Sequence, residues 1–177
     1  MAGLIDTVLD LARARLGGGL HLNRNRNQLL GPALDEVVQE LRASWPDRQI
    51  NVDINLPEPI DCDRARIAQL LSNLLANALA HGAADTPVFV CASVDGGTLE
   101  LSVTNQGMPI SPTVIARLFE PFCRPLSDSG HQGLGLGLYI ASEIARARRY
   151  AVRDVTARGD ALRFQDGAAT IGAAPVT

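Results

Sequence analysis

Apolar residues recur at helical intervals in four stretches of the chain. The longest predicted helix ends near His81 and has Asp61 or Asp63 as its candidate N-cap. Projected at about 3.6 residues per turn, its apolar residues form one continuous stripe: Ile67, Leu70, Leu71, Leu74, Leu75, Ala78 and Leu79. The other helices are predicted over residues 4–16, over residues 32–45 and, after a glycine-rich segment, up to about Ala147.

Other segments alternate apolar and polar residues, as strands do. QINVDINL, residues 49–56, predicts one strand, which Pro57 and Pro59 end. PVFVCASV and TLELSVTN flank the turn DGG and predict a β-hairpin over residues 87–105. SPTVIARLFEPF then predicts a short helix that ends at Pro121. Helices interleaved with hairpins favour an α+β fold in two layers.

Composition indicates a globular domain and argues against several kinds of partner. Of the 177 residues, 46% are hydrophobic and 4% aromatic, so aliphatic side chains must fill the core. A net charge of −3 gives no bulk attraction to nucleic acid or to a membrane surface. The sequence has neither a membrane-length apolar run nor a leader segment, so we expect a cytoplasmic protein. Cys62, Cys91 and Cys123 lack paired spacing, which favours free thiols in a reducing compartment.

Two asparagines interrupt the longest predicted helix, although asparagine is a mediocre helix former. Asn73, Asn77 and His81 follow one another at intervals of four along one edge of the apolar stripe. Polar groups at such an edge can line a pocket beneath another element. A carboxamide oxygen there suits Mg²⁺, which keeps most of its waters and shares phosphate oxygens. On this helix alone the plainer interpretation, that both amides face water, stays open.

Two glycine-containing segments add to the candidate chemistry. NQGMPI begins at Asn105 directly after a predicted strand, where a loop can present a polar side chain into a cleft. Gly107 allows the backbone to approach a flat ligand closely. GLGLGL then brings Gly133, Gly135 and Gly137 just before a helix, whose N-terminus attracts phosphate. The triplet does not open a βαβ unit, so it is not the Rossmann fingerprint.

Taken in order, these segments resemble the nucleotide-binding domain of sensor histidine kinases. That domain belongs to the superfamily of DNA gyrase, the heat-shock chaperone ATPase and the mismatch-repair ATPases. Residues 73–78 (NLLANA) resemble the N box, and VTNQGMPI resembles the first glycine box. LFEPF, residues 118–122, is similar to the phenylalanine box, and GLGLGL to the second glycine box. The resemblance covers about residues 29–147 and implies a Bergerat-type fold, a two-layer α/β sandwich with helices on one face of a mixed sheet.

The resemblance also implies roles in binding ATP and Mg²⁺. Asn73 would bind the metal, and Asn77 would hold the metal or the phosphates beside it. Asn105 would accept a hydrogen bond from the adenine amino group, and Gly107 would pass close to the ring. The glycines of the second box would hinge a lid over residues 123–132. The residues implied in ATP binding are Asn73, Asn77, His81, Asn105, Gly107, Ile110, Phe122, Arg124, Gly133, Leu134, Gly135 and Gly137.

Four positions depart from the family pattern. Asn105 stands where an aspartate is usual, which leaves an acceptor for adenine but removes its charge. Pro109 replaces a glycine, and Ala80 replaces a lysine that would contact phosphate. Gln69 stands where hydrolysing relatives often have a glutamate that activates water. We therefore expect ATP binding without vigorous ATP hydrolysis, and these changes allow a weak affinity.

The implied activity is transfer of the ATP γ-phosphoryl group to a histidine supplied by another domain or chain. No segment resembles the S-H-E-L-R motif of a phosphoacceptor, so no catalytic residue is assigned and no self-phosphorylation is expected. Residues 1–26 resemble the end of a dimerisation hairpin and its linker, and residues 27–147 the ATP-binding catalytic domain.

The partners implied are a histidine-containing dimerisation domain and, through it, a response regulator. A homodimer would form only through the missing part of the hairpin. Two alternatives stay open. One is a freestanding serine kinase of the anti-sigma type, which binds a protein partner. The other is a degenerate nucleotide-binding pseudokinase module, supported by Ala80 and Asn105.

The tail, residues 148–177, departs from the family more strongly. The family would continue with H-G-G and two strands, whereas this chain continues Arg-Arg-Tyr-Ala. Codons for those four residues can spell His-Gly-Gly-Thr in a shifted frame, so one hypothesis is a frameshift. The alternative is divergence, with AVRDVTA and ALRFQ as edge strands. Sequencing the gene tests the first hypothesis, which fails if no other frame restores the family pattern.

Overall fold

The structure is a computed structural model and describes residues 25–95, 98–107, 113, 117–122 and 135–147. Three helices and five strands lie within these ranges. The helices are α2 (Leu30–Ser44), α3 (Arg64–His81) and α5 (Gly137–Ala147). The strands are β1 (Asn25–Gln28), β2 (Ile50–Asn55), β3 (Ile60–Cys62), β4 (Val88–Asp95) and β5 (Thr98–Thr104).

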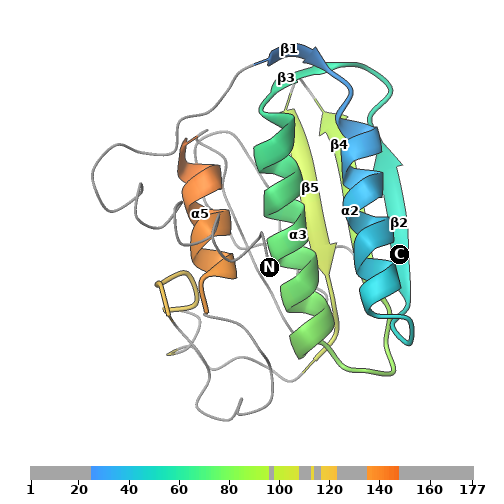
Figure 1. Ribbon diagram of the computed structural model, residues 1–177, viewed down its shortest axis with the longest axis vertical. Coiled ribbons are helices and arrows are strands. Elements are labelled where there is room, and N and C mark those ends of the chain that lie inside the picture. The colour runs from blue at the N-terminus through green and yellow to red at the C-terminus, as the bar shows by residue number, and fades with distance from the viewer. Residues whose placement is uncertain (1–24, 96–97, 108–112, 114–116, 123–134, 148–177) are drawn as a thin grey trace.

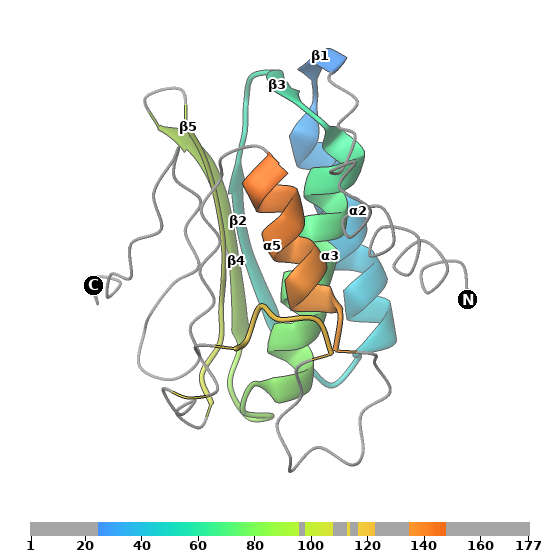
Figure 2. The ribbon, with the colours of Figure 1, turned by 90° about the vertical axis from the view of Figure 1, so that its left-hand side faces the viewer.

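A mixed sheet in the order β2–β4–β5 forms one layer of the fold. β2 and β4 are parallel and in register from Ile50↔Val88 to Asn55↔Ser93, whereas β4 and β5 are antiparallel. Parallel neighbours need a crossover connection, and α3 lies in the one between β2 and β4. All three described helices cover the same face of the sheet, and α3 lies between α2 and α5 (Figures 1 and 2). The predicted two-layer α+β fold is confirmed.

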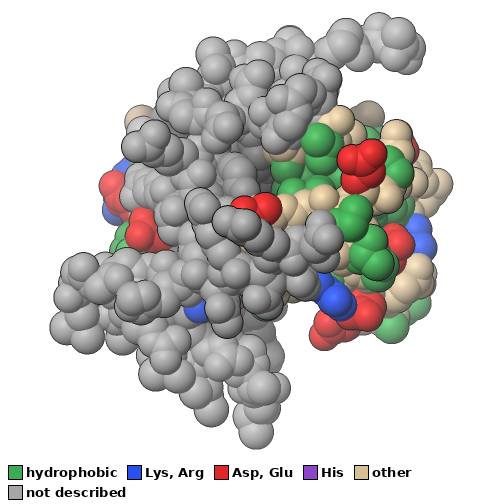
Figure 3. Space-filling view, turned by 90° about the horizontal axis from the view of Figure 1, so that it is seen from above, with side chains coloured by type: hydrophobic (Ala, Val, Ile, Leu, Met, Phe, Trp, Pro, Cys, Tyr) green, Lys and Arg blue, Asp and Glu red, His purple; other side chains and the backbone are tan. Residues whose placement is uncertain are grey.

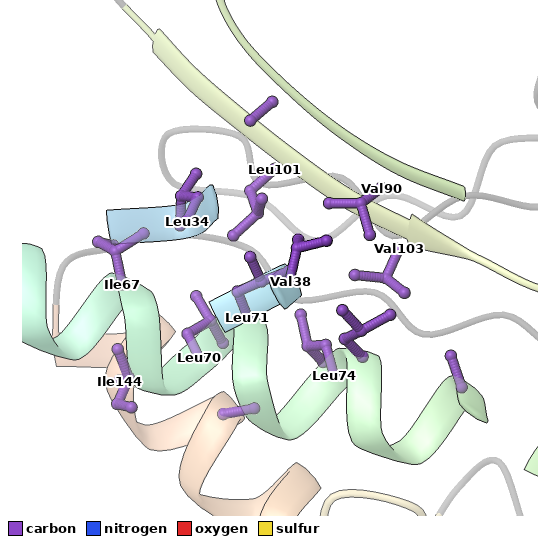
Figure 4. Packing of buried hydrophobic residues seen from close by; sticks show 14 of the residues in the cluster. Leu34, Val38, Ile67, Leu70, Leu71, Leu74, Val90, Leu101, Val103 and Ile144 are labelled. Carbon is purple, nitrogen blue, oxygen red and sulfur yellow. The ribbon is translucent and has the colours of Figure 1, made fainter. Parts of the chain in front are cut away.

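The core lies between α3 and the inner face of this sheet. All seven residues of the predicted stripe on α3 are buried. Leu71 and Leu74 point toward Leu101 and Val103 of β5 (Figure 4). Burying one leucine side chain contributes about 1.5–3 kcal/mol. The stripe therefore fixes the rotation of α3, and with it the direction of the polar edge beside the stripe.

Both ends of α3 are closed by local hydrogen bonds. Asp63 is the N-cap, and its carboxylate accepts from the backbone N–H of Arg66 at 3.2 Å, so the second of the two predicted caps is the observed one. At the other end, the N–H of Gly82 donates to the carbonyl oxygen of Ala78 at 2.9 Å. These caps set the length of the helix and the point at which the chain turns away from it.

Most predicted elements are confirmed, and two differences have local causes. The strand at 49–56, the hairpin and three helices match β2, β4–β5, α2, α3 and α5. The antiparallel pair of β1 and β3 was missed, because each strand is very short and β1 is wholly polar. The helix expected to end at Pro121 is wrong over residues 117–122, which form turns. There the N–H of Glu120 donates to the carbonyl of Arg117 at 2.8 Å, and Pro121 has no N–H with which to continue.

Other predictions fall outside the described residues. They are the helix over residues 4–16, the lid over residues 123–132 and the two hypotheses on residues 148–177. Seen from above, the described surface mixes acidic, basic and apolar side chains (Figure 3). Within the described ranges, no helix combines the length and the apolar character needed to cross a membrane.

Candidate functional site

One edge of α3 carries the polar side chains selected by the sequence analysis. Asn73 and Asn77 are partly buried, and His81 in the last turn is exposed. The amide nitrogen of Asn73 is buried, and within the described part of the chain no acceptor reaches it. A buried donor without a partner costs about 1–3 kcal/mol. The site therefore holds a donor that the acceptor oxygen of a ligand can satisfy.

The first turn of α5 lies against Asn73. A Cβ atom built on Gly137 would stand 3.7 Å from Oδ1 of Asn73. The N–H of Ile140 donates to the carbonyl of Leu136 at 2.9 Å, which makes Leu136 the N-cap residue. Its apolar side chain cannot accept from the N–H groups of the first turn, which have no partner within the helix, and that turn contains no acidic residue. This helix end is therefore suited to an anion.

A second group of residues meets at the C-terminal end of α3. Asn105 follows β5, is only 4% exposed, and donates from Nδ2 to the carbonyl of Gln106 at 3.3 Å. A Cβ atom on Gly82 would stand 2.9 Å from this Nδ2, and one on Gly107 would stand 3.7 Å from it. The N–H of Ala83 donates to the same carbonyl of Gln106 at 2.6 Å. The loops after α3 and after β5 are thus joined around the side chain of Asn105.

A backbone hydrogen bond joins Phe122 and Gly135, which are distant in the sequence. The N–H of Phe122 donates to the carbonyl of Gly135 at 3.0 Å, and both residues have positive φ, 62° and 66°. Glycine adopts this conformation freely, whereas in a bulky residue it costs about 1–3 kcal/mol. The ring of Phe122 is 55% exposed, while Phe119 is partly buried and packs against the core. Of these two residues, Phe119 therefore helps to fill the core, whereas Phe122 lies at the surface.

The structure brings most of the predicted site residues into two groups. Asn73 lies near Gly137, which begins α5, and Asn77 lies one turn further along α3, whereas His81, Asn105 and Gly107 gather where α3 ends. A Cβ atom on Gly107 would stand 3.4 Å from the carbonyl oxygen of His81. Four predicted residues lie outside the described residues: Ile110, Arg124, Gly133 and Leu134.

Two residues at the second group were missed by the sequence analysis. Gly82 had a signal, because a glycine directly after a helix is a common C-terminal residue. Arg48 had none, because it precedes β2 and is far from Asn105 in the sequence. Its Nη1 donates to the carbonyl of Ala83, and its Nη2 would stand 3.1 Å from a Cβ atom on Gly82. Only tertiary structure brings this arginine to Asn105.

Comparison with known proteins identifies the class to which this fold and site belong. Residues 62–165 match the family of histidine kinase-, DNA gyrase B- and HSP90-like ATPases. The chain is 34% identical over 166 residues to a bacteriophytochrome of Pseudomonas aeruginosa, covering 93% of this chain and 22% of that protein. It is 34% identical over 171 residues to the sensor histidine kinase TrcS of Mycobacterium tuberculosis, covering 92% and 33%. The structure of full-length ShkA in complex with AMPPNP has a TM-score of 0.71 and 31% identity, over 98% of this chain and 37% of that one.

The chain belongs to the family of histidine kinase-, DNA gyrase B- and HSP90-like ATPases. The resemblance drawn from the four sequence boxes is confirmed, and the fold is that of histidine kinase catalytic domains. The chain spans about a fifth and a third of the length of the two relatives above, 22% and 33%. It therefore corresponds to the ATPase-like part of such proteins.

Proposed function

We propose that this chain binds Mg·ATP and acts as the catalytic domain of a sensor histidine kinase. The observation that carries the proposal is the contact between Asn73 and the first turn of α5. The buried nitrogen of this amide finds no acceptor among the described residues, and the amide lies beside a helix N-terminus whose N-cap residue, Leu136, has an apolar side chain. The phosphate oxygens of a nucleotide would satisfy both the amide nitrogen and the free N–H groups.

The residues around Asn73 also fit a magnesium ion. The described residues include no group of three histidine, cysteine or carboxylate side chains that could hold a metal ion. A metal here would depend on amide oxygens, waters and phosphate oxygens, and Mg²⁺ is the ion most often bound in that way. Asn73 would hold it through Oδ1, with Asn77 one turn further along α3. When bound, the ion would neutralise charge on the phosphates.

The C-terminal end of α3 suits the nucleotide base. Asn105 would accept a hydrogen bond from the amino group of adenine through Oδ1. Gly107 would allow a ring to approach, since it carries no side chain. Asn73 and Gly82 are nine residues apart, which corresponds to about 13 Å along a helix. The phosphates and the base would therefore lie along one edge of α3.

The γ-phosphoryl group would then be transferred to a histidine supplied by another domain or chain. Positioning and charge stabilisation would provide the rate, rather than activation of water. Gln69 supports a mechanism without activation of water. It lies one turn before Asn73, carries no charge, and accepts a hydrogen bond from Nη1 of Arg66 at 2.7 Å. The partners in this proposal are a cytoplasmic histidine-containing dimerisation domain and, through it, a response regulator.

A binding measurement on Asn73→Ala tests the metal and phosphate end. We expect a loss of Mg·ATP affinity of roughly tenfold or more, which corresponds to about 1.4 kcal/mol, and a much smaller loss for ADP without metal. Asn55→Ala is the matched control, because Asn55 is exposed on β2, away from α3 and α5, and should change neither affinity. Equal losses for Mg·ATP and metal-free ADP in Asn73→Ala would contradict the metal role.

A phosphotransfer assay tests the activity itself. The chain is mixed with γ-labelled ATP, Mg²⁺ and a separate dimerisation hairpin that carries a phosphoacceptor histidine. We expect acid-labile label on that histidine. Label on a serine of a small antagonist protein would instead indicate an anti-sigma-type kinase. Nucleotide binding without any transfer would indicate a pseudokinase module, and absence of binding would refute the proposed function.

A further inference from the structure

Arg48, Gly82 and Asn105 form a junction, defined here by these three residues, at the base end of the proposed site. The point where a Cβ atom of Gly82 would stand lies 2.9 Å from Nδ2 of Asn105 and 3.1 Å from Nη2 of Arg48. The two side chains approach each other only because Gly82 has no side chain between them. The junction thus brings a guanidinium group to the amide of Asn105.

Within the described part of the chain, the guanidinium group of Arg48 is a cation without a matching anion. Nη1 donates to the carbonyl of Ala83, but Nε and Nη2 are buried and, among the described residues, find no acceptor. No carboxylate of the described ranges forms an ion pair with it. A buried charge that no counter-ion neutralises acts strongly on nearby dipoles, because the local dielectric constant is low. The amide of Asn105 faces this charge across the position that a Cβ atom of Gly82 would occupy.

The amide of Asn105 can offer either a donor or an acceptor to a ligand. Its side chain makes one hydrogen bond with the described residues, from Nδ2 to Gln106. Rotating the amide by half a turn exchanges Oδ1 and Nδ2, which differ little in shape. The exchanged amide gives up its hydrogen bond to the carbonyl of Gln106 and presents its oxygen on the side of Nη2 of Arg48, which finds no acceptor among the described residues. Nδ2 can then donate to a ligand. A carboxylate in the same position could only accept.

Purine bases differ in whether the substituent at carbon 6 donates or accepts a hydrogen bond. Adenine carries an amino group there, which donates, whereas guanine and hypoxanthine carry a carbonyl oxygen, which accepts. A carboxylate pairs with the amino group and repels the carbonyl oxygen. An amide pairs with either after a half turn, and the positive charge of Arg48 favours a base with a carbonyl group.

We propose that the base site of this domain accepts 6-oxopurine nucleotides, such as GTP and ITP, as well as ATP, and that Asn105 and Arg48 set this specificity. The inference rests on the proposed function, since it takes the base to lie at Asn105. Asn105 forms the hydrogen bond to the substituent at carbon 6. Arg48 is a positioning residue, which acts on the base through the orientation of the Asn105 amide and through its charge.

Dissociation constants for Mg·ATP, Mg·GTP and Mg·ITP, measured by titration calorimetry, test the inference. We expect the three values to lie within about tenfold of one another, since one amide serves all three bases. Asn105→Asp should raise the preference for ATP over GTP and ITP by roughly tenfold or more, because the carboxylate keeps only the acceptor. A wild-type protein that binds ATP but discriminates against GTP and ITP by more than about a hundredfold would overturn the inference and leave the proposed function standing.

Two further variants separate specificity from folding. Arg48→Gln removes the charge and should weaken GTP and ITP binding more than ATP binding. Arg42→Gln is the matched control, because Arg42 also donates to a backbone carbonyl, that of Ile50 at 2.8 Å, but lies outside the junction. It should leave the preference unchanged. Unchanged preference in both Asn105→Asp and Arg48→Gln, with melting temperatures near that of the wild type, would overturn the inference. Failure of the wild type to bind any nucleotide would refute the proposed function as well.

Discussion

Gly82→Ala places a methyl group in the most crowded position of the site. Its Cβ atom would stand 2.5 Å from the carbonyl oxygen of Ala78, 2.9 Å from Nδ2 of Asn105 and 3.1 Å from Nη2 of Arg48. The backbone at Gly82 has φ −71° and ψ 156°, which alanine adopts without strain. The substitution therefore tests steric crowding alone. The carbonyl group of Ala78 cannot move away freely, because it accepts the last hydrogen bond of α3 from the N–H of Gly82 at 2.9 Å.

The expected loss of stability follows from three opposing effects. Weakening the last hydrogen bond of α3 costs about 0.5–1.5 kcal/mol, and overpacking costs about 1–3 kcal/mol. Replacing glycine by alanine stabilises the protein by about 0.4–1 kcal/mol, because it lowers the conformational entropy of the unfolded chain. The net loss is about 2 kcal/mol, which lowers the melting temperature by roughly 4–8 °C for a chain of this size.

Thermal unfolding followed by circular dichroism, together with nucleotide titration, measures both consequences. Gly31→Ala in α2 is the matched control, because a Cβ atom there would meet only Cγ2 of Ile54, at 3.9 Å. That variant should be as stable as the wild type or more stable, since alanine favours a helix by up to about 1 kcal/mol over glycine. A melting temperature of Gly82→Ala at or above the wild-type value would refute the steric reasoning and the assignment of Gly82 as a spacer between Arg48 and Asn105.

Three further predictions concern stability and thiol chemistry. Asp63→Ala removes the N-cap of α3 and should lower the free energy of unfolding by about 1 kcal/mol in urea titrations, whereas exposed Asp61→Ala should not. Leu71→Ala empties a fully buried position and should cost about 2–5 kcal/mol in the same assay; a loss well under 1 kcal/mol would contradict this packing. Burial and then the neighbouring Asp53 carboxylate raise the pKa of the Cys91 thiol, so alkylation at pH 8 should be slower than for a free thiol and faster in Asp53→Asn. Equal rates in both proteins would contradict the electrostatic cause.

The sequence by itself determined the local elements of this protein. The stripe on α3 could be predicted because a helix repeats every 3.6 residues or so, and burial selects one face. The hairpin of β4 and β5 followed from alternation around DGG, and capping chemistry narrowed the start of α3 to Asp61 or Asp63, of which Asp63 is the observed cap. The two asparagines could be placed on one edge of the stripe for the same periodic reason. All of these depend on residues close together in the chain.

Local patterns failed where an element was too short or where the chain departed from regular dihedral angles. β1 and β3 are stabilised by pairing with each other, and the sequence of neither short segment predicts this pairing. The turns over residues 117–122 end in Phe122, whose positive φ is held by a hydrogen bond to Gly135. A residue that is strained by a distant contact cannot be recognised from its neighbours.

Tertiary structure alone decided which residues share the site. The crossover through α3 makes β2 and β4 parallel neighbours, and this topology brings the loop of Arg48 to the end of β5. There the guanidinium group lies near Asn105 across Gly82, and at the middle of α3 the turn beginning at Gly137 meets Asn73. Such contacts join segments that are distant in sequence, and their geometry depends on the packing of the whole core. Local propensities therefore identify the polar residues, whereas the packed core determines which of them meet.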